Sequence, residues 1–195
     1  MSLLWLVLLI IIIVIAVIIY KKYNNNNFVY VQSTVDDNFY RVRDLEDKQI
    51  ASDMLAKIKK NILTLTTYLY ENKEDYPEFE PYIEQLNNKI KNVVVVESPE
   101  NSIYTSYSVN KGEQIVFCLR SRKVKNKLYQ LNLLMYVVLH EMAHVACPEY
   151  NHTPLFKKIF AFLTIMAIRL GLYHKIDFYN NPVEYCGLLI TDSII

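Results

Sequence analysis

The chain has 195 residues, which is enough for one domain and an appendage. Its 21 lysines and arginines nearly balance its 20 acidic residues, so the net charge is +1. A chain this close to neutral has no general electrostatic attraction for nucleic acid, and we do not expect a nucleic-acid-binding protein. Hydrophobic residues make up 52% of the chain, and part of them form one block near the N-terminus.

The N-terminal block runs from Leu3 to Tyr20 without a charged residue. A helix of this length can cross the hydrocarbon core of a bilayer, and Trp5 and Tyr20 lie near its ends, as interfacial aromatic residues do. A cleaved signal peptide fits less well, because no basic segment precedes the block and no small-residue cleavage site follows it. The sequence therefore predicts a transmembrane anchor over residues 1–22 that contacts the membrane through residues 3–20.

Lys21 and Lys22 follow this block, and no basic residue precedes it. The positive-inside rule then predicts a single-pass membrane protein whose C-terminal domain faces the cytosol. The chain has three cysteines, and this odd number without a C-x-x-C pair is typical of a reducing compartment.

Residues 23–43 contain the polar tract Asn24–Asn27 and little periodic signal, so we expect a linker. The predicted domain spans residues 44–195, and its first part, residues 44–91, is predicted to be helical. Between Asp44 and Tyr70 apolar residues recur at helical spacing, and a second amphipathic helix is predicted from about Pro77 to Lys91. The apolar stripe of the first helix contains Ala51, Met54, Leu55, Ile58, Ile62, Leu65 and Leu69.

The second part, residues 93–195, begins with strand signals. Val93–Val96 is β-branched throughout, and Ile103–Val109 and Gln114–Leu119 flank the turn signal Asn110–Gly112, which together indicate a hairpin. An exposed edge of one hairpin strand could pair with an extended peptide. The alternative is that both strands are covered within their own sheet.

A basic cluster follows the hairpin. We interpret it first as a solvated loop, and binding of a phosphate backbone or an anionic membrane surface is the alternative. Its members are Arg120, Arg122, Lys123, Lys125 and Lys127.

The most specific motif is His140-Glu141-Met142-Ala143-His144, in a chain with only four histidines. The surrounding apolar residues predict a helix from about Leu128 to Cys147, ended by Pro148. On a helix His140 and His144 share a face and can reach one metal ion, whereas Glu141 is rotated off that face and can hold a water.

His152 follows at a usable distance. Thr153 is a candidate N-cap and Pro154 fits the first turn of a helix that runs to about Leu170, so His152 would lie on fixed backbone. Three imidazoles leave the fourth position of a zinc ion open for water. We therefore expect Zn²⁺ bound by His140, His144 and His152, with Glu141 as general base and then acid.

Several assignments around this site stay open. Tyr185, one of sixteen tyrosines, is a candidate donor to the oxyanion. Cys147 could be a fourth ligand that closes the site, and Glu184 could replace His152 as third ligand. We interpret His174 as structural.

The HExxH segment and the run His152-Thr153-Pro154-Leu155-Phe156 resemble the WLM and SprT (Spartan)-type zinc metallopeptidases. The resemblance covers residues 93–171. It implies an α+β fold, a minimal zincin-like domain of helices and a small antiparallel sheet, here behind the N-terminal transmembrane helix. It also implies His140, His144 and His152 as zinc ligands and Glu141 as the catalytic residue. The chain departs from the families at Thr153, where Gly or Asp is common.

The predicted function is a membrane-anchored zinc metallopeptidase that acts on a protein or peptide substrate. Two alternatives stay open. The first is a catalytically silent membrane or assembly protein that keeps the zincin fold, and the second is a zinc hydrolase of a non-peptide amide. Glu141 favours an enzyme, because a scaffold needs no general base.

Overall fold

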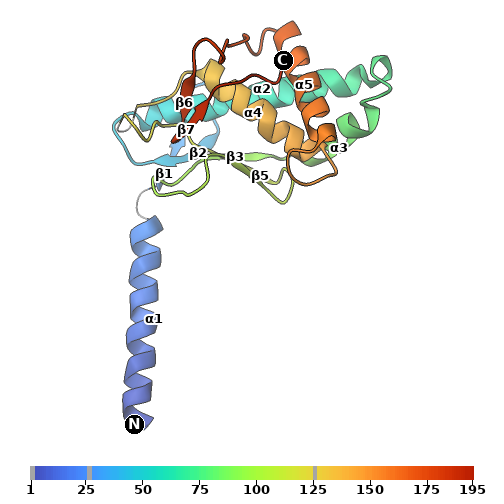
Figure 1. The fold of residues 1–195 in the computed structure, drawn as a ribbon. Coiled ribbons are helices and arrows are strands. Elements are labelled where there is room, and N and C mark those ends of the chain that lie inside the picture. Colours follow the sequence, from blue (N-terminus) through green and yellow to red (C-terminus); the bar gives the residue numbers. More distant parts are fainter. Residues whose placement is uncertain (1–2, 26–27, 125–126) are drawn as a thin grey trace.

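The computed structural model describes residues 3–25, 28–124 and 127–195. Asn26 and Asn27 of the predicted linker and Lys125 of the basic cluster lie outside these ranges. Five α-helices, one short 3-10 helix and seven strands are assigned within them. Figure 1 shows helix α1 (Leu3–Asn25) standing away from the other elements, which pack together.

Helix α1 contains the apolar block, but the transmembrane prediction is wrong. Among the residues that the structure describes, no helix combines the length and the apolarity that a bilayer crossing requires. The prediction of a single-pass membrane protein is therefore wrong as well.

A hairpin occupies most of the segment predicted to be a linker. Strands β1 (Phe28–Gln32) and β2 (Phe39–Arg43) pair in antiparallel register. Asp36 closes the turn by accepting hydrogen bonds from the backbone N–H of Asn38 at 3.2 Å and from the hydroxyl of Tyr40 at 2.6 Å. Tyr40 is buried in the main core, so the hairpin is part of the domain.

Helices α2 (Lys48–Glu71) and α3 (Glu80–Ile90) confirm the two predicted amphipathic helices, and the short 3-10 helix η1 (Lys73–Asp75) joins them. Each buries one apolar stripe, as helical spacing of apolar residues requires. The fully buried members include Ala51, Leu55, Ile58, Ile62, Leu65 and Leu69 on α2 and Ile83, Leu86 and Ile90 on α3.

The central sheet has the strand order β3-β5-β4, with bounds Val94–Glu97, Gln114–Phe117 and Tyr107–Val109. The β4–β5 hairpin confirms the prediction, but β3 pairs with β5 in parallel, so the predicted all-antiparallel sheet is wrong. These parallel strands need no crossover helix, because β4 comes between them in sequence and runs in the opposite direction. β5 is the central strand and β4 lies at an edge.

The β4–β5 turn packs directly against the helices behind it. Asn110 and Lys111 have positive φ angles of 48° and 50°, and Gly112 has a φ of +113°. A Cβ at Gly112 would lie 3.0 Å from Cγ1 of Val145 and 3.2 Å from Cβ of Lys89. Glycine is therefore required both by the backbone angle and by the close approach of the turn to its neighbours.

Helices α4 (Leu131–Ala146) and α5 (Pro154–Arg169) form the layer that carries the histidines. α4 packs against α2, α3 and α5, and it is buried on nearly all sides. The chain ends with a third hairpin, β6 (Val183–Tyr185) and β7 (Leu188–Ile190), which the sequence did not predict.

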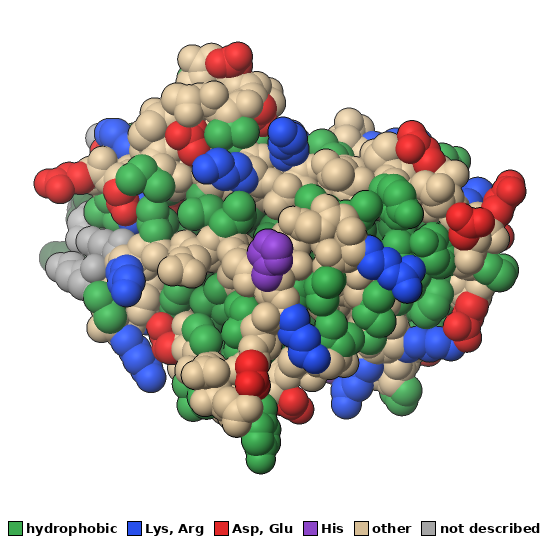
Figure 2. Space-filling model, turned by 90° about the horizontal axis from the view of Figure 1, so that it is seen from above, with side chains coloured by type: hydrophobic (Ala, Val, Ile, Leu, Met, Phe, Trp, Pro, Cys, Tyr) green, Lys and Arg blue, Asp and Glu red, His purple; other side chains and the backbone are tan. Residues whose placement is uncertain are grey.

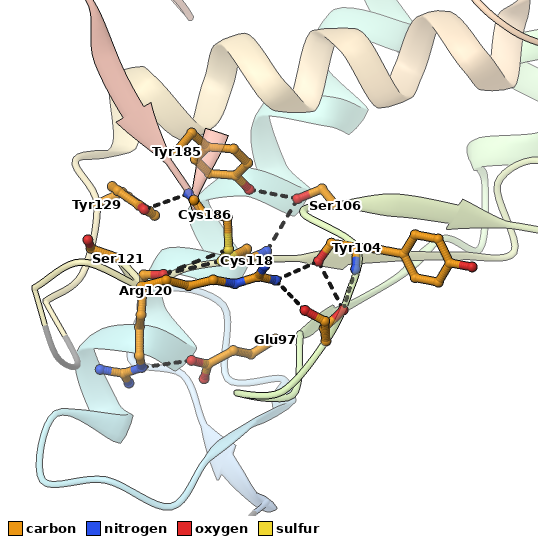
Figure 3. Close-up of a disulfide and its surroundings, with 12 residues drawn as sticks. Glu97, Tyr104, Ser106, Cys118, Arg120, Ser121, Tyr129, Tyr185 and Cys186 are labelled. Atoms are coloured by element: carbon orange, nitrogen blue, oxygen red, sulfur yellow. Dashed lines mark hydrogen bonds and ion pairs between the residues drawn. A yellow bond between two sulfur atoms is a disulfide. The ribbon is translucent and has the colours of Figure 1, made fainter. Parts of the chain in front are cut away.

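A disulfide between Cys118 and Cys186 ties this last hairpin to the end of β5 (Figure 3). The two Cα atoms are 6.3 Å apart. The expectation of unpaired cysteines is wrong for these two, because residues far apart in sequence meet where β5 ends. Cys147 is free and buried.

The prediction of a solvated basic loop is wrong for Arg120. This side chain is buried and bonds Glu97 at 2.7 Å and Asp47 at 2.5 Å. Arg122 is exposed and donates to the backbone carbonyls of Ser102 and Tyr104 at 2.6 and 2.8 Å. Burial of a guanidinium needs such ion partners, so Arg120 joins elements of the core instead of facing solvent.

Candidate active site

Three histidine side chains converge at one point. His140 and His144 lie one turn apart on α4, and His152 precedes α5. The Nε2 atom of His140 lies 3.1 Å from Nε2 of His144 and 3.1 Å from Nε2 of His152. One ring nitrogen of each histidine lies within 4.8 Å of the other two, so the three could hold one metal ion.

The distances between these nitrogens fit three ligands of one shared cation better than they fit hydrogen bonds between the rings. A ring nitrogen carries either one N–H or one lone pair, so Nε2 of His140 cannot bond both neighbours at once. Two nitrogens on a tetrahedral zinc ion, each about 2.05 Å from the metal, are about 3.3 Å apart. The observed 3.1 Å is close to that value.

The charges at the cluster also suit a metal. Burial, followed by the electrostatic effect of His144 and His152, lowers the pKa of His140 to about 3. Burial lowers the pKa of His144 to about 4, with contributions from His152 and Lys111. Both imidazoles are therefore neutral at pH 7, and neutral imidazole is the form that binds a metal.

The start of α5 fixes His152, as the sequence predicted. Thr153 is the N-cap, and its Oγ1 accepts a hydrogen bond from the backbone N–H of Phe156 at 3.2 Å, while Pro154 occupies the first turn. The Phe156 ring packs against all three imidazoles, with centroid distances of 5.1, 4.3 and 4.8 Å to His140, His144 and His152. A buried ring thus supports the whole cluster.

Lys111 links the loop after α4 to the β4–β5 turn. Its Nζ donates to the backbone carbonyls of Cys147 at 3.0 Å and Pro148 at 2.9 Å. These carbonyls lie at the C-terminal end of α4, where a cation is favoured by the helix dipole. The segment between His144 and His152 is therefore held at its first residues by the hairpin turn.

Glu141 points into the same cleft as the histidines. The cleft has a volume of about 620 Å³. Burial raises the pKa of Glu141 to about 8, because its side chain is only 4% exposed and the charged form loses its hydration. The cleft is lined by residues of the β4 region (Thr105, Ser106, Tyr107, Ser108), of α4 (Tyr136, Val137, His140, Glu141, His144) and of the last hairpin (Tyr185, Leu188, Ile190), among others.

Tyr185 forms part of the cleft wall. Its hydroxyl lies 2.6 Å from Oγ of Ser106, and Oγ of Ser106 accepts a hydrogen bond from the backbone N–H of Cys118 (Figure 3). Burial raises the pKa of Tyr185 well above its usual range, so the hydroxyl stays protonated and can donate. The structure places this predicted residue at the cleft that holds Glu141.

The alternative ligands lie elsewhere. Glu184 accepts hydrogen bonds from Ser121 Oγ at 2.9 Å, Tyr129 Oη at 3.0 Å and the backbone N–H of Gly187 at 2.6 Å, so it stabilises the β6–β7 turn. In the part of the chain that the structure describes, the metal-binding group contains only the three histidines, without Cys147 or Glu184. The fourth histidine, His174, is exposed and bonds Asn132 only through its backbone.

Sequence reasoning missed several residues of the cleft. Tyr136 lies one turn before His140 on α4, so its position four residues ahead of the motif was a usable signal. Ser108 lies in the predicted hairpin but was not singled out. Leu188 and Ile190 could not be found, because the strand that carries them was not predicted.

Comparisons with known proteins give relatives without a stated activity. No family model matches the chain. The crystal structure of a Wss1 mutant from Saccharomyces cerevisiae is similar with a TM-score of 0.37 at 22% identity, covering 52% of this chain and 87% of that one. A likeness at this level carries no argument about fold or function.

Three viral proteins are similar in sequence. Protein 136R of Invertebrate iridescent virus 6 is 36% identical over 50% of this chain and 53% of its own length. Protein 042R of Invertebrate iridescent virus 3 is 39% identical over 54% of this chain and 62% of its own length. Uncharacterized protein R325 of Acanthamoeba polyphaga mimivirus is 47% identical over 85% of this chain and 84% of its own length. The chain therefore belongs to the same protein family as R325 of mimivirus.

Proposed function

We propose that this protein is a zinc-dependent metallopeptidase that hydrolyses peptide bonds in a protein or peptide substrate. One observation carries the proposal: the Nε2 atoms of His140, His144 and His152 converge in a cleft that also contains the buried carboxyl group of Glu141. A purely structural zinc site would more often have four ligands rich in cysteine. A three-histidine site beside a carboxylate suits hydrolysis.

His140, His144 and His152 would bind Zn²⁺ and leave one coordination position open to the cleft. When bound, the ion supplies Lewis-acid polarisation of a water molecule and of the substrate carbonyl. The positive charge of a bound ion would hold the pKa of Glu141 below the value of about 8 that burial alone gives it, so the carboxylate form would be available. Glu141 would then take a proton from the attacking water and deliver it to the leaving amine nitrogen as the peptide bond breaks. Its position next to His140 on α4 keeps this carboxyl group on the same rigid helix as two of the ligands.

The edge of strand β4 would hold the substrate. β5 covers one side of β4, and the other side has no strand partner among the described residues. An extended peptide can add to such an edge through main-chain hydrogen bonds. Ser108 on β4 also lines the cleft, so this edge lies beside the histidines and Glu141.

Tyr185 would donate a hydrogen bond to the oxyanion that develops on the substrate carbonyl. Its hydroxyl stays protonated and is held near the cleft by Ser106. Fixed donors of this kind stabilise the transition state because they need no reorientation during the reaction.

The charge distribution agrees with a peptide substrate better than with nucleic acid. Figure 2 shows basic and acidic side chains interspersed with hydrophobic ones over the face that it displays. A protein that binds a phosphate backbone usually gathers its basic side chains into one patch or stripe.

The test combines metal analysis with matched variants of the full chain. We expect about one zinc per chain in the wild type and in Glu141→Gln, with cleavage of a denatured protein substrate only by the wild type. His152→Ala should lose most of the zinc, whereas His174→Ala, which changes the one histidine outside the cluster, should retain it.

The other results each contradict the proposal. Equal cleavage by wild type and Glu141→Gln would show that Glu141 transfers no proton. Zinc bound without activity on any protein or peptide would favour the silent scaffold, or the amide hydrolase if small amides are cleaved. If protein purified without chelator contained no zinc, the proposed zinc site would be refuted.

A further inference from the structure

We propose that the cleft contains a preformed subsite for an apolar side chain of the substrate, at a position next to the scissile bond. This inference rests on the proposed function and adds the substrate class to it. Five residues beside the histidine cluster form the subsite: Tyr136 and Val137 from α4, Tyr185 from β6, and Leu188 and Ile190 from β7.

The inner wall of the subsite is rigid. The Tyr136 ring packs against Phe160, Tyr173 and Phe178, with centroid distances of 5.2, 5.9 and 4.9 Å. Its hydroxyl accepts a hydrogen bond from the backbone N–H of Ile194 at 3.1 Å. The polar end of Tyr136 is therefore already bonded, and the ring is what the cleft offers to a ligand. Val137 lies beside it and is 8% exposed.

The outer wall is one face of strand β7. Side chains alternate between the two faces of a strand, so Leu188 and Ile190 point to the same side. Both line the cleft, whereas Leu189 between them does not. Leu188 is nevertheless 60% exposed. A large apolar side chain that faces a cleft and remains open to solvent can gain free energy by burial under a ligand.

Two interactions fix this outer wall to the rest of the domain, and a third braces the turn within the wall itself. The disulfide holds Cys186 to Cys118 at the end of β5, and the backbone N–H of Cys186 donates to the hydroxyl of Tyr129 at 2.7 Å (Figure 3). Glu184 accepts the N–H of Gly187 at 2.6 Å across the turn. The distance between the two walls is thus set by the fold before a substrate binds.

The occupant follows from the chemistry of the walls. The walls consist of two tyrosine rings, a valine, a leucine and an isoleucine, which offer dispersion contacts and no charge. A Leu, Ile, Met or Phe side chain therefore fits, and an acidic one does not. Burial of an apolar side chain in a pocket of this kind discriminates by roughly 10- to 100-fold. The histidines and Glu141 lie in the same cleft, which places this side chain next to the bond to be cut.

The experiment compares two substitutions on neighbouring residues of β7 in the full chain. Leu188→Lys places a charge in the subsite, and Leu189→Lys, at 57% exposure on the opposite face, is the matched control. The probes are two short fluorescein-labelled peptides of Gly, Ser and Ala that differ only at one central residue, Leu or Asp. Cleavage is measured as kcat/KM, and binding to the same variants in the Glu141→Gln background is measured by fluorescence anisotropy.

We expect the wild type to prefer the Leu peptide over the Asp peptide by roughly tenfold or more. Leu188→Lys should abolish or reverse this preference, in cleavage and in binding, and Leu189→Lys should preserve it. Equal use of both peptides by the wild type, or the same loss in both variants, would overturn the subsite. If no peptide is cleaved but the Leu preference in binding depends on Leu188, the subsite stands and the peptidase proposal fails.

Discussion

The disulfide between Cys118 and Cys186 should be a major contributor to stability. It closes a loop with a sequence separation of 68 residues, and this loop contains His140, His144 and His152. In the chain-entropy model, closing a loop of this length lowers the entropy of the unfolded chain by about 15 cal/mol/K, or about 4.4 kcal/mol at 25 °C. Measured values usually fall below this figure, so we expect 2–4 kcal/mol.

The assay is urea unfolding of the wild type and of a double variant with Cys118→Ala and Cys186→Ala. With a dependence of about 2 kcal/mol per molar urea, the midpoint should fall by about 1–2 M in the variant. Far-UV circular dichroism should follow the transition, because the only tryptophan, Trp5, lies in α1 away from the core. A reductant should lower the midpoint of the wild type to that of the variant and leave the variant unchanged.

Cys147→Ala is the control, since Cys147 is a buried free cysteine. This variant should lose some packing energy but keep the full response to reductant. Two results would refute the reasoning: a wild-type midpoint that does not respond to reductant, or three reactive thiols in the wild type when it is unfolded without reductant.

Two further predictions concern the ends of elements that position the core and the site. Thr153→Ala removes the N-cap of α5, which should lower the free energy of unfolding by about 1 kcal/mol and the melting temperature by roughly 2–4 °C. Thr153→Ser keeps the capping hydroxyl and should restore both. Because His152 directly precedes the cap, a zinc competition titration should also show weaker zinc binding in the Ala variant. Partial burial raises the pKa of Asp53, but hydrogen bonds from Thr34 and Ser33 outweigh this and leave the pKa below its usual value. A depressed pKa stabilises the fold above the unfolded value of about 3.9, and this contribution is lost as the pH falls through the folded pKa. Asp53→Ala should therefore be less stable than the wild type by about 1–3 kcal/mol at pH 7. In urea unfolding, this difference in the free energy of unfolding should narrow below about pH 4. A difference that does not change with pH would contradict a stabilising role for the Asp53 carboxylate.

The parts of the fold that could be predicted are those with a local signal. The amphipathic stripes of α2 and α3 and the Thr153–Pro154 start of α5 each depend on spacing within a few residues. The histidine cluster also has a local signal, because His140 and His144 share a helix face and His152 follows within the next few residues of the chain. Helical periodicity and capping are properties of short segments, so one sequence is enough to reveal them.

The parts that were missed depend on contacts between distant segments. The β6–β7 turn has Cys186 and Gly187 with φ angles of 51° and 89°, and a cysteine is an unusual residue at the first of two positions with positive φ. The disulfide partner of Cys186 could not be identified, because spacing alone does not fix connectivity. The burial of Arg120 was missed for the same reason. Its charge indicated an exposed side chain, whereas its ion partners Glu97 and Asp47 are distant in sequence.

The close packing of the β4–β5 turn has a consequence for how substrate binding is divided between enthalpy and entropy. Gly112 lies against Val145 on the histidine helix, and Lys111 bonds the carbonyls at the end of that helix. The strand edge and the ligand helix therefore behave as one rigid unit. The orientational entropy of bringing a peptide edge and a metal centre together is then lost during folding, so little of it remains to be lost when a substrate binds.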